Sequence, residues 1–257
     1  MPQPGTLGER IVRRRFAAIA EVYDATIGAR RQVYNQAVDA IVLDRVRDMP
    51  GLTLLDAGCG TAVRSAELKR QLPHARVVGV DASAPMIERA RAQGLDEVRV
   101  GRLDEIDDPD GSFDAITCLF FVICYLTTRA ERERAVANFH RLLKPGGLLF
   151  VDAINLWHLG EGLDFRRSAL EAGWDYLRSL LDPRLSPGDK LYSTAHDGRQ
   201  LPGFFHGFSH RSLARLLRGA GFVIDHQYTI GYNSGGLRRR FFEGQILHVC
   251  HRPAEAR

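Results

Sequence analysis

The stretch Leu54-Leu-Asp-Ala-Gly-Cys-Gly-Thr-Ala62 decides the fold. Its leucines are typical of a buried strand, and two glycines follow where the chain must turn before a helical segment that starts near Val63. Glycine lacks a Cβ atom, so the backbone can turn tightly and approach a ligand closely. A strand, a glycine turn and a helix in this order place the amino end of the helix beside the bound group. The stretch therefore predicts the first unit of an α/β domain with a ligand at the turn.

Acidic residues at the ends of successive strands indicate what kind of ligand this is. A nicotinamide-dinucleotide fingerprint would need a third glycine where Val63 stands. Asp56 instead enters the turn, which suits a cofactor whose nearby end is a cationic amino acid. The next strand ends on Asp81, where a carboxylate can accept hydrogen bonds from both hydroxyls of a ribose. The third strand leads to Leu103 and Asp104, where a leucine can contact an adenine ring and a carboxylate can accept a hydrogen bond from its amino group. Each acid alone could be a turn or helix cap, but together they indicate an adenosine-type cofactor.

The rest of the chain alternates between strand-like and helical patterns. Strands are expected at residues 52–56, 76–81, 97–101, 113–119, 147–153, 222–228 and 243–250. Helices are expected at 63–71, 84–92, 129–143 and 209–220. Strands separated by helices predict a doubly wound α/β fold with a mainly parallel sheet. The last strand follows the sixth through a glycine-rich link, so it is expected to run antiparallel.

Two segments fall outside this alternation. Residues 1–49 have the apolar spacing of helices, and residues 50–257 form the predicted core domain. Within the core, residues 154–207 are a long interval with a helix-like piece at 165–181. Long insertions at the carboxyl ends of strands often cover a substrate. We therefore expect a helical cap at 1–49 and a substrate lid at 154–207, with a solvated excursion as the alternative for the insertion.

Composition and charge narrow the class of protein. The chain has 257 residues, 45% hydrophobic and 26% charged, which are globular values. Its net charge of +4 divides into +3 for residues 1–47, −5 for 48–198 and +6 for 199–257, and the acidic middle argues against a continuous nucleic-acid surface. The longest apolar run has 12 residues, whereas a membrane span needs about 20. Four scattered cysteines fit neither a zinc site nor a disulfide framework, so we expect a cytoplasmic protein without a membrane span.

With these motifs the sequence resembles the class I S-adenosylmethionine-dependent methyltransferases. The matching positions are the first motif Asp56-x-Gly58-x-Gly60, the ribose acid Asp81, the adenine contact Leu103-Asp104, and the segments 113–118, 142–147 and 216–222. The resemblance covers about residues 50–250. It implies a Rossmann-like, doubly wound sheet of seven strands, mainly parallel with the last strand antiparallel. It also implies S-adenosylmethionine as the methyl donor and S-adenosylhomocysteine as its product.

The resemblance implies further cofactor contacts. Tyr23 stands next to an aspartate, and this pair is similar to one that small-molecule members place over the cofactor. Ala82, Met86 and Leu119 lie at matching strand and helix ends and are expected to line the same site. No pair of cysteine or histidine has metal-ligand spacing and no acidic triplet suggests magnesium, so no metal is expected.

A catalytic base is needed only if the acceptor must lose a proton. The candidates are Tyr125, which follows the fourth strand, and His206, which precedes the helix leading to the sixth strand. A hydrogen-bonded structural role is the alternative for His206. The cluster Arg238-Arg-Arg240 is either an exposed turn or a clamp for a carboxylate or phosphate.

The acceptor is expected to be a small molecule. Residues 118–121 lack the Asn/Asp-Pro-Pro-Tyr/Phe turn with which amino-methyltransferases hold a flipped base, so nucleic acid is disfavoured. We expect methylation of an oxygen, nitrogen or activated carbon of an acidic or aromatic compound, in bacterial secondary or specialised metabolism. The alternatives are carbon methylation of a quinone precursor, a cofactor-binding protein without transferase activity, and a nicotinamide oxidoreductase. The sequence does not predict the oligomeric state.

Overall fold

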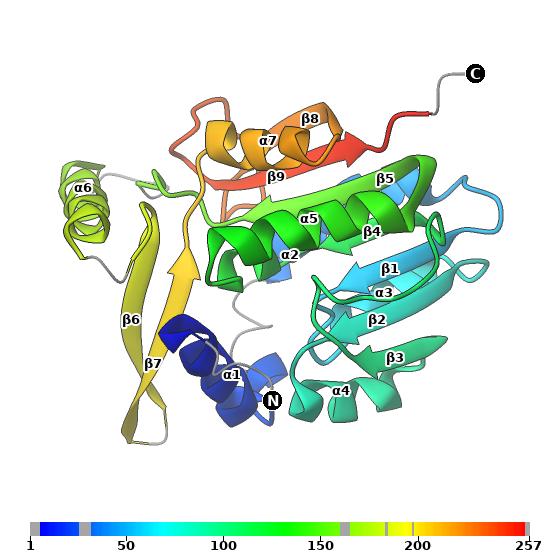
Figure 1. Cartoon of the computed structure of the whole chain (residues 1–257), viewed down its shortest axis with the longest axis horizontal. Coiled ribbons are helices and arrows are strands. Elements are labelled where there is room, and N and C mark those ends of the chain that lie inside the picture. The colour runs from blue at the N-terminus through cyan, green and yellow to red at the C-terminus, as the bar shows by residue number, and fades with distance from the viewer. Residues whose placement is uncertain (1–5, 26–31, 160–164, 183–184, 197, 255–257) are drawn as a thin grey trace.

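A computed structural model describes residues 6–25, 32–159, 165–182, 185–196 and 198–254 (Figure 1). The strands are β1 (Thr53–Ala57), β2 (Arg76–Asp81), β3 (Glu97–Val100), β4 (Phe113–Cys118), β5 (Leu143–Ala153), β6 (Asp189–His196), β7 (Arg199–His206), β8 (Val223–Ile230) and β9 (Gln245–His251). Seven of them form one sheet in the order β3-β2-β1-β4-β5-β9-β8, and β6 and β7 form a separate hairpin.

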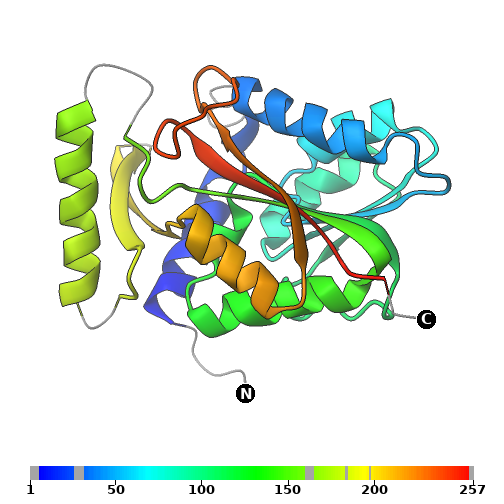
Figure 2. The ribbon, with the colours of Figure 1, turned by 90° about the horizontal axis from the view of Figure 1, so that it is seen from above.

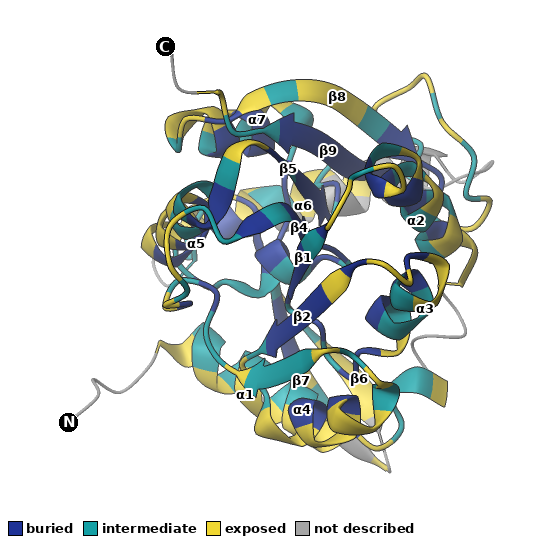
Figure 3. Cartoon of the chain, turned by 90° about the vertical axis from the view of Figure 1, so that its right-hand side faces the viewer, coloured by how far each residue is buried: buried dark blue, intermediate teal, exposed yellow. Residues whose placement is uncertain are grey.

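The pairing of the strands confirms the predicted architecture. The neighbours β3, β2, β1, β4 and β5 run parallel, and β9 runs antiparallel to both β5 and β8. Residues along β1, β4, β5 and β9 are buried, whereas β8 at the edge is largely exposed (Figure 3). Central parallel strands need cover on both faces, and Figure 2 shows helices on each side of the sheet.

The helices lie close to the predicted ranges. They are α1 (Leu7–Ile19), α2 (Gln32–Val46), α3 (Val63–Gln71), α4 (Ala84–Ala90), α5 (Arg129–Leu142), α6 (Phe165–Leu181) and α7 (His210–Gly219), with short 3-10 turns η3 (Arg91–Gln93) and η4 (Val122–Tyr125). Capping boxes at Thr128 and Ser209 fix where α5 and α7 begin. In Figure 2, α2 and α3 cover one face of the sheet, and α5 and α7 cover the other.

The insertion between β5 and α7 contains more regular structure than the sequence predicted. Its helix α6 has the predicted bounds, but the β6–β7 hairpin was not predicted. After β7, Phe208 forms a parallel bridge with Asn155, which returns the chain to the carboxyl edge of the sheet. The hairpin stands beside the sheet with α6 outermost, and α1 lies between the hairpin and α4 (Figures 1 and 2). The insertion and the first helix therefore meet at the edge where the glycine turn lies.

The turn after β4 has an unusual backbone that a buried acid supports. Phe120 and Phe121 have φ angles of +69° and +66°, in a region that costs a residue with a side chain about 1 kcal/mol or more. Asp152 of β5 accepts the backbone N–H of Phe121 at 2.6 Å and the hydroxyl of Tyr34 at 3.2 Å. Burial raises the pKa of Asp152 to about 6, although these hydrogen bonds and the charge of Arg64 oppose the shift. Asp152 thus holds the β4 turn against β5.

The raised pKa makes the stabilising effect of Asp152 depend on pH. A carboxyl group whose pKa is higher in the folded than in the unfolded chain stabilises the folded state while it is protonated. For Asp152 this stabilisation is complete below the ordinary pKa of an aspartate and is lost as pH rises through about 6. Asp152→Asn removes the titration and keeps an acceptor oxygen. From pH 5 to pH 8, we expect the free energy of unfolding of the parent protein to fall by about 1–2 kcal/mol more than that of the variant in urea titrations. Parallel pH profiles for the two proteins would contradict this role.

Candidate active site

The carboxyl ends of β1, β2 and β4 meet at one edge, because these strands are parallel neighbours. The turn after β1 has left-handed backbone at Gly58 and Gly60, with φ of +92° and +56°. A Cβ atom at Gly58 would collide with Val122 of η4. A Cβ atom at Gly60 would meet nothing within 4 Å. The turn is therefore closed by η4 at its first glycine and open at its second.

Asp81, at the end of β2, lies against this open turn. Its Oδ2 accepts the backbone N–H of Gly60 at 3.0 Å and its Oδ1 accepts that of Ser83 at 2.8 Å. Burial raises the pKa of Asp81, and the two backbone hydrogen bonds oppose this shift. The Oγ of Ser83 is buried and bonds to no residue in the described part of the chain. A half-buried carboxylate and a buried hydroxyl without a protein partner, beside an open glycine turn, fit a polar ligand with hydroxyl groups.

Asp56 lies deeper, under the same turn. Its Oδ1 accepts the hydroxyl of Thr117 at 2.8 Å, and its Oδ2 accepts the hydroxyl of Ser65. Burial raises its pKa, against these hydrogen bonds and the charge of Arg64. Asp56 therefore braces the first turn of α3 against β4, and its predicted contact with a cationic ligand end stays a prediction.

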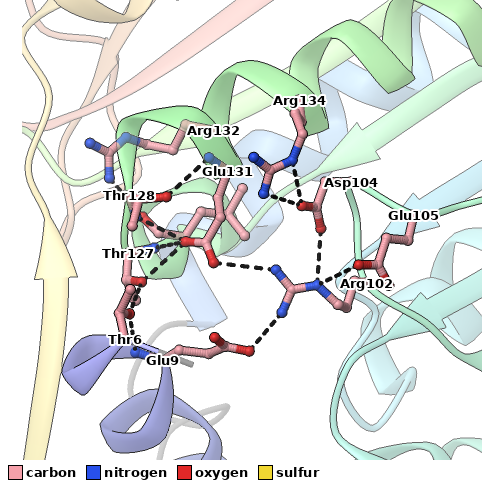
Figure 4. Close-up of polar contacts among 11 residues, drawn as sticks. Thr6, Glu9, Arg102, Asp104, Glu105, Thr127, Thr128, Glu131, Arg132 and Arg134 are labelled. Atoms are coloured by element: carbon pink, nitrogen blue, oxygen red, sulfur yellow. Dashed lines mark hydrogen bonds and ion pairs between the residues drawn. The ribbon is translucent and has the colours of Figure 1, made fainter. Parts of the chain in front are cut away.

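Asp104 is turned toward α5. Its Oδ1 accepts from Nε of Arg102 at 3.1 Å, and its Oδ2 accepts from Nη2 of Arg134 at 2.9 Å (Figure 4). Both carboxylate oxygens are thus occupied in ion pairs, while the neighbouring Leu103 is buried in the core. The predicted adenine contact of Asp104 would have to compete with these two arginines.

Arg102 links three segments that are distant in sequence. Its Nη1 donates to Glu9 of α1 at 2.7 Å, and its Nη2 donates to Glu131 of α5 at 3.2 Å (Figure 4). Glu131 also accepts the backbone N–H groups of Thr127 and Thr128, both at 2.9 Å. The segment after β3 is thereby tied to α1 and to the start of α5. Sequence reasoning missed this network, because no local pattern pairs Arg102 with Glu9.

The chain after α1 lies over the glycine turn. The hydroxyl of Thr61 donates to Asp24 at 2.6 Å, which ties this segment to the start of α3. The ring of Tyr23 is edge-on to that of Phe120, with centroids 6.4 Å apart. Three other predicted cofactor contacts lie at strand and helix ends of the same edge: Met86 and Leu119, which are buried, and Ala82, which is exposed.

The two candidate bases have different surroundings. Tyr125, at the end of η4, packs edge-on against Phe16 of α1, with ring centroids 4.9 Å apart. His206, at the end of β7, has its Nδ1 2.7 Å from Oδ1 of Asp189 on β6. Desolvation lowers the pKa of His206 and outweighs the opposing effect of Asp189. Asp189 was not among the residues predicted from the sequence, because the hairpin that brings it to His206 was not recognised.

The arginine cluster lies in the link between β8 and β9. Since β9 is antiparallel to both β5 and β8, the end of β8 reaches the same edge as the glycine turn. Arg238 donates to Ser234 at 2.7 Å, and Arg240 pairs with Glu243 at 3.3 Å. Arg239 is exposed. Arg238 and Arg240 thus bind different partners within the link.

No metal cluster is found in the described ranges: none of their histidine, cysteine, aspartate and glutamate residues form a group of three or more that could hold an ion. None of the helices in the described part of the chain combines the length and the apolar character that a membrane crossing needs.

Comparisons with known proteins agree with this geometry. A family model described as a methyltransferase domain matches residues 54–147. The chain is 35% identical over 106 residues to a trans-aconitate 2-methyltransferase of Deinococcus radiodurans, a match that covers 41% of this chain and only 39% of that protein. It is 32% identical over 228 residues to dTDP-4-amino-2,3,4,6-tetradeoxy-D-glucose N,N-dimethyltransferase of Saccharopolyspora spinosa, which covers 88% of this chain and 87% of that protein.

A solved structure shows the same fold. The S-adenosylmethionine-bound amino pentose methyltransferase of Micromonospora echinaspora aligns with a TM-score of 0.59 and 22% identity, over 90% of this chain and 96% of that one. The seven-stranded sheet, the glycine turn and the near full-length relative lead to one conclusion. The chain belongs to the family of S-adenosylmethionine-dependent methyltransferases of the small-molecule type.

Proposed function

We propose that this methyltransferase acts on the amino nitrogen of a small molecule, and that its substrate class is a nucleotide-linked amino sugar. The observation that carries the proposal is the match over 88% of the chain and 87% of its relative to an enzyme named for N,N-dimethylation of such a compound. The net charge of +6 in residues 199–257 and the exposed Arg239 suit an acceptor that bears a diphosphate.

The proposed cofactor site is the edge formed by the ends of β1 and β2. The donor supplies a methyl group carried on a positively charged sulfur. The open side of Gly60 gives room for it, and Asp81 and Ser83 offer an acceptor and a hydroxyl for its ribose. Asp24, held by Thr61, and Tyr23 would cover it from above. We retain the other predicted contacts in this proposal: Asp56, Gly58, Ala82, Met86, Leu103, Asp104 and Leu119.

The reaction gains most from alignment. Because the positive charge disappears in the transition state, holding donor and acceptor in line and excluding water can contribute about 7–11 kcal/mol. We propose that α1 and the insertion 154–207 exclude water as a cap and a lid. Arg15 of α1 supports this role, since it donates to the carbonyl oxygen of Leu201 at 3.1 Å and to Thr194 at 3.0 Å, both on the hairpin.

A protonated amine cannot attack, so a base must accept a proton from the acceptor. We propose His206 for this step, because desolvation keeps it neutral and its Nδ1 is held by Asp189. Tyr125 is the second candidate. We also keep the cytoplasm as the proposed location, since all four cysteines are buried free thiols.

Two glycine variants test the proposed cofactor site. Gly60 and Gly94 both have left-handed backbone, with φ of +56° and +79°, and a Cβ atom at either would meet nothing within 4 Å. Gly60→Ala and Gly94→Ala should therefore lose similar stability, about 1–2 kcal/mol. Only Gly60→Ala places a methyl group in the proposed site. We expect its dissociation constant for S-adenosylhomocysteine to rise at least about tenfold by calorimetry, with no change for Gly94→Ala. Equal affinity in both variants would move the site elsewhere.

Product analysis tests the proposed acceptor. Incubation with S-adenosylmethionine and a dTDP-linked 4-amino sugar should give N-methylated product by mass spectrometry. His206→Ala should lower turnover by about 100- to 10,000-fold and leave cofactor affinity unchanged. A product methylated only on oxygen or carbon, as for a quinone precursor, would contradict the amine proposal. Tight product-cofactor binding without turnover of amine, hydroxyl or quinone acceptors would indicate a binding protein instead.

A further inference from the structure

Asp189 and His206 form a buried pair at the open end of the hairpin. The two residues are opposite each other across β6 and β7, at the last paired position before the open end of the hairpin. Asp189 is 5% exposed and His206 is 8% exposed, and Oδ1 of Asp189 lies 2.7 Å from Nδ1 of His206. Burying a carboxylate costs free energy unless hydrogen bonds compensate for the lost water, so the burial of Asp189 depends on its hydrogen bonds.

The surrounding backbone is built to fix Asp189. Its Oδ2 accepts the backbone N–H of Ser186 at 2.7 Å, and its own N–H donates to the carbonyl oxygen of Ser186 at 2.8 Å. Gly188 has a φ of +100°, and a Cβ atom there would lie 2.8 Å from the carbonyl oxygen of Gly207 and 3.3 Å from Cε1 of His206. Only glycine therefore allows β6 and β7 to approach closely enough for the pair to form.

The pair fixes which ring nitrogen carries the proton. Desolvation lowers the pKa of His206, so the ring is neutral near pH 7 and has a single N–H group. The carboxylate of Asp189 can only accept, so Nδ1 of His206 is the donor. Nε2 then presents a lone pair, and no residue of the described chain donates a hydrogen bond to it. This is the tautomer that a general base needs.

The pair also lies close to the edge that holds the proposed site. Two residues after His206, the backbone N–H of Phe208 donates to Ile154 at 2.8 Å, immediately beyond the end of β5. The strand β7 packs against η4, which carries Tyr125. The rings of His206 and Phe208 pack edge-on, with their centroids 4.7 Å apart, and this contact further restricts the orientation of the imidazole.

We propose that Asp189 is a positioning residue for methyl transfer, which holds His206 with Nε2 ready to accept the proton of the acceptor amine. The inference rests on the proposed role of His206 as the base. In the balanced step, the acceptor nitrogen forms a bond to the methyl carbon, and the donor sulfur keeps the electron pair of the broken S–C bond. The proton lost by the nitrogen passes to Nε2 of His206 and then to water.

The chain offers a matched control. Asp225 and His251 form a second aspartate–histidine pair at 2.8 Å, but their side chains are 27% and 32% exposed. His251 is the last residue of β9 and pairs with Val223 at the start of β8, so this pair lies at the opposite edge of the sheet from the glycine turn. Asp225→Asn therefore changes the same chemical group in the same kind of pair, away from the proposed site.

The experiment compares Asp189→Asn, Asp225→Asn, His206→Ala and the double variant Asp189→Asn/His206→Ala, all in the full chain. We expect Asp189→Asn to lower kcat at least about 100-fold at pH 7. Its acceptor KM and S-adenosylhomocysteine affinity should stay within about twofold. The deficit should shrink as pH rises, because the free amine then forms without the base. The double variant should be no slower than His206→Ala, because the two residues act as a unit.

The outcomes separate this inference from the proposed function. Full activity of His206→Ala would overturn the role of His206 as the base and the inference with it. A slow His206→Ala variant beside a fully active Asp189→Asn variant would overturn only the role of Asp189. A deficit in Asp189→Asn that is equal at every pH, accompanied by weaker cofactor binding or early thermal unfolding, would show that Asp189 is structural. Full activity of Asp225→Asn is expected, and a comparable loss there would contradict the specificity of the pair.

Discussion

The two hydrogen bonds of the Asp81 carboxylate fix the edge at which we propose that the cofactor binds. The carboxylate accepts the N–H groups of Gly60 and Ser83, so one side chain holds both the turn after β1 and the turn before α4. This is possible because β1 and β2 are parallel and in register, with Ala57 opposite Val80. A carboxylate that is partly removed from water must be compensated by hydrogen bonds, and the N–H groups of Gly60 and Ser83 supply two. Asp81 therefore fixes the backbone at Gly60, on whose other side a Cβ atom would meet nothing within 4 Å.

A second set of contacts brings distant segments over this edge. Arg102 binds Glu9 of α1 and Glu131 of α5, and Asp24 is held by Thr61 (Figure 4). Because Arg102 is only half-buried, salt screens these ion pairs more than it would screen fully buried ones. The N-terminal helix is thus attached to the core by these polar contacts and by a small apolar cluster beside α4, whereas the sheet is held by a large apolar core. This division suits the proposed role of α1 as a cap that opens for cofactor exchange.

Much of the fold could be predicted from the sequence, because the central strands β1 and β4 are rich in buried apolar residues and the glycine turn marks where β1 ends. The hairpin was missed because Pro202 and Gly203 are unusual within a strand and break the apolar pattern of β7, and because its partner strand β6 contains many polar residues. The dipeptide Asp197-Gly198 in the sequence is nevertheless a recognised turn signal. The pairing of Asp189 with His206 could not be predicted without that hairpin. Asp104 was predicted as a ligand contact, but Arg134, one of its two arginine partners, lies on α5 and leaves no local pattern.

We propose that the edge formed by β1 and β2 binds S-adenosylmethionine through Asp81. Calorimetric titration of the parent protein and of Asp81→Ala with S-adenosylhomocysteine tests it most directly, with thermal unfolding of both proteins as the control for folding. Two hydrogen bonds to a charged group contribute about 1.5–3 kcal/mol each. We therefore expect one binding site for S-adenosylhomocysteine in the parent protein and at least about a tenfold loss of affinity for it in a folded Asp81→Ala variant. Equal affinity in the two folded proteins would contradict it.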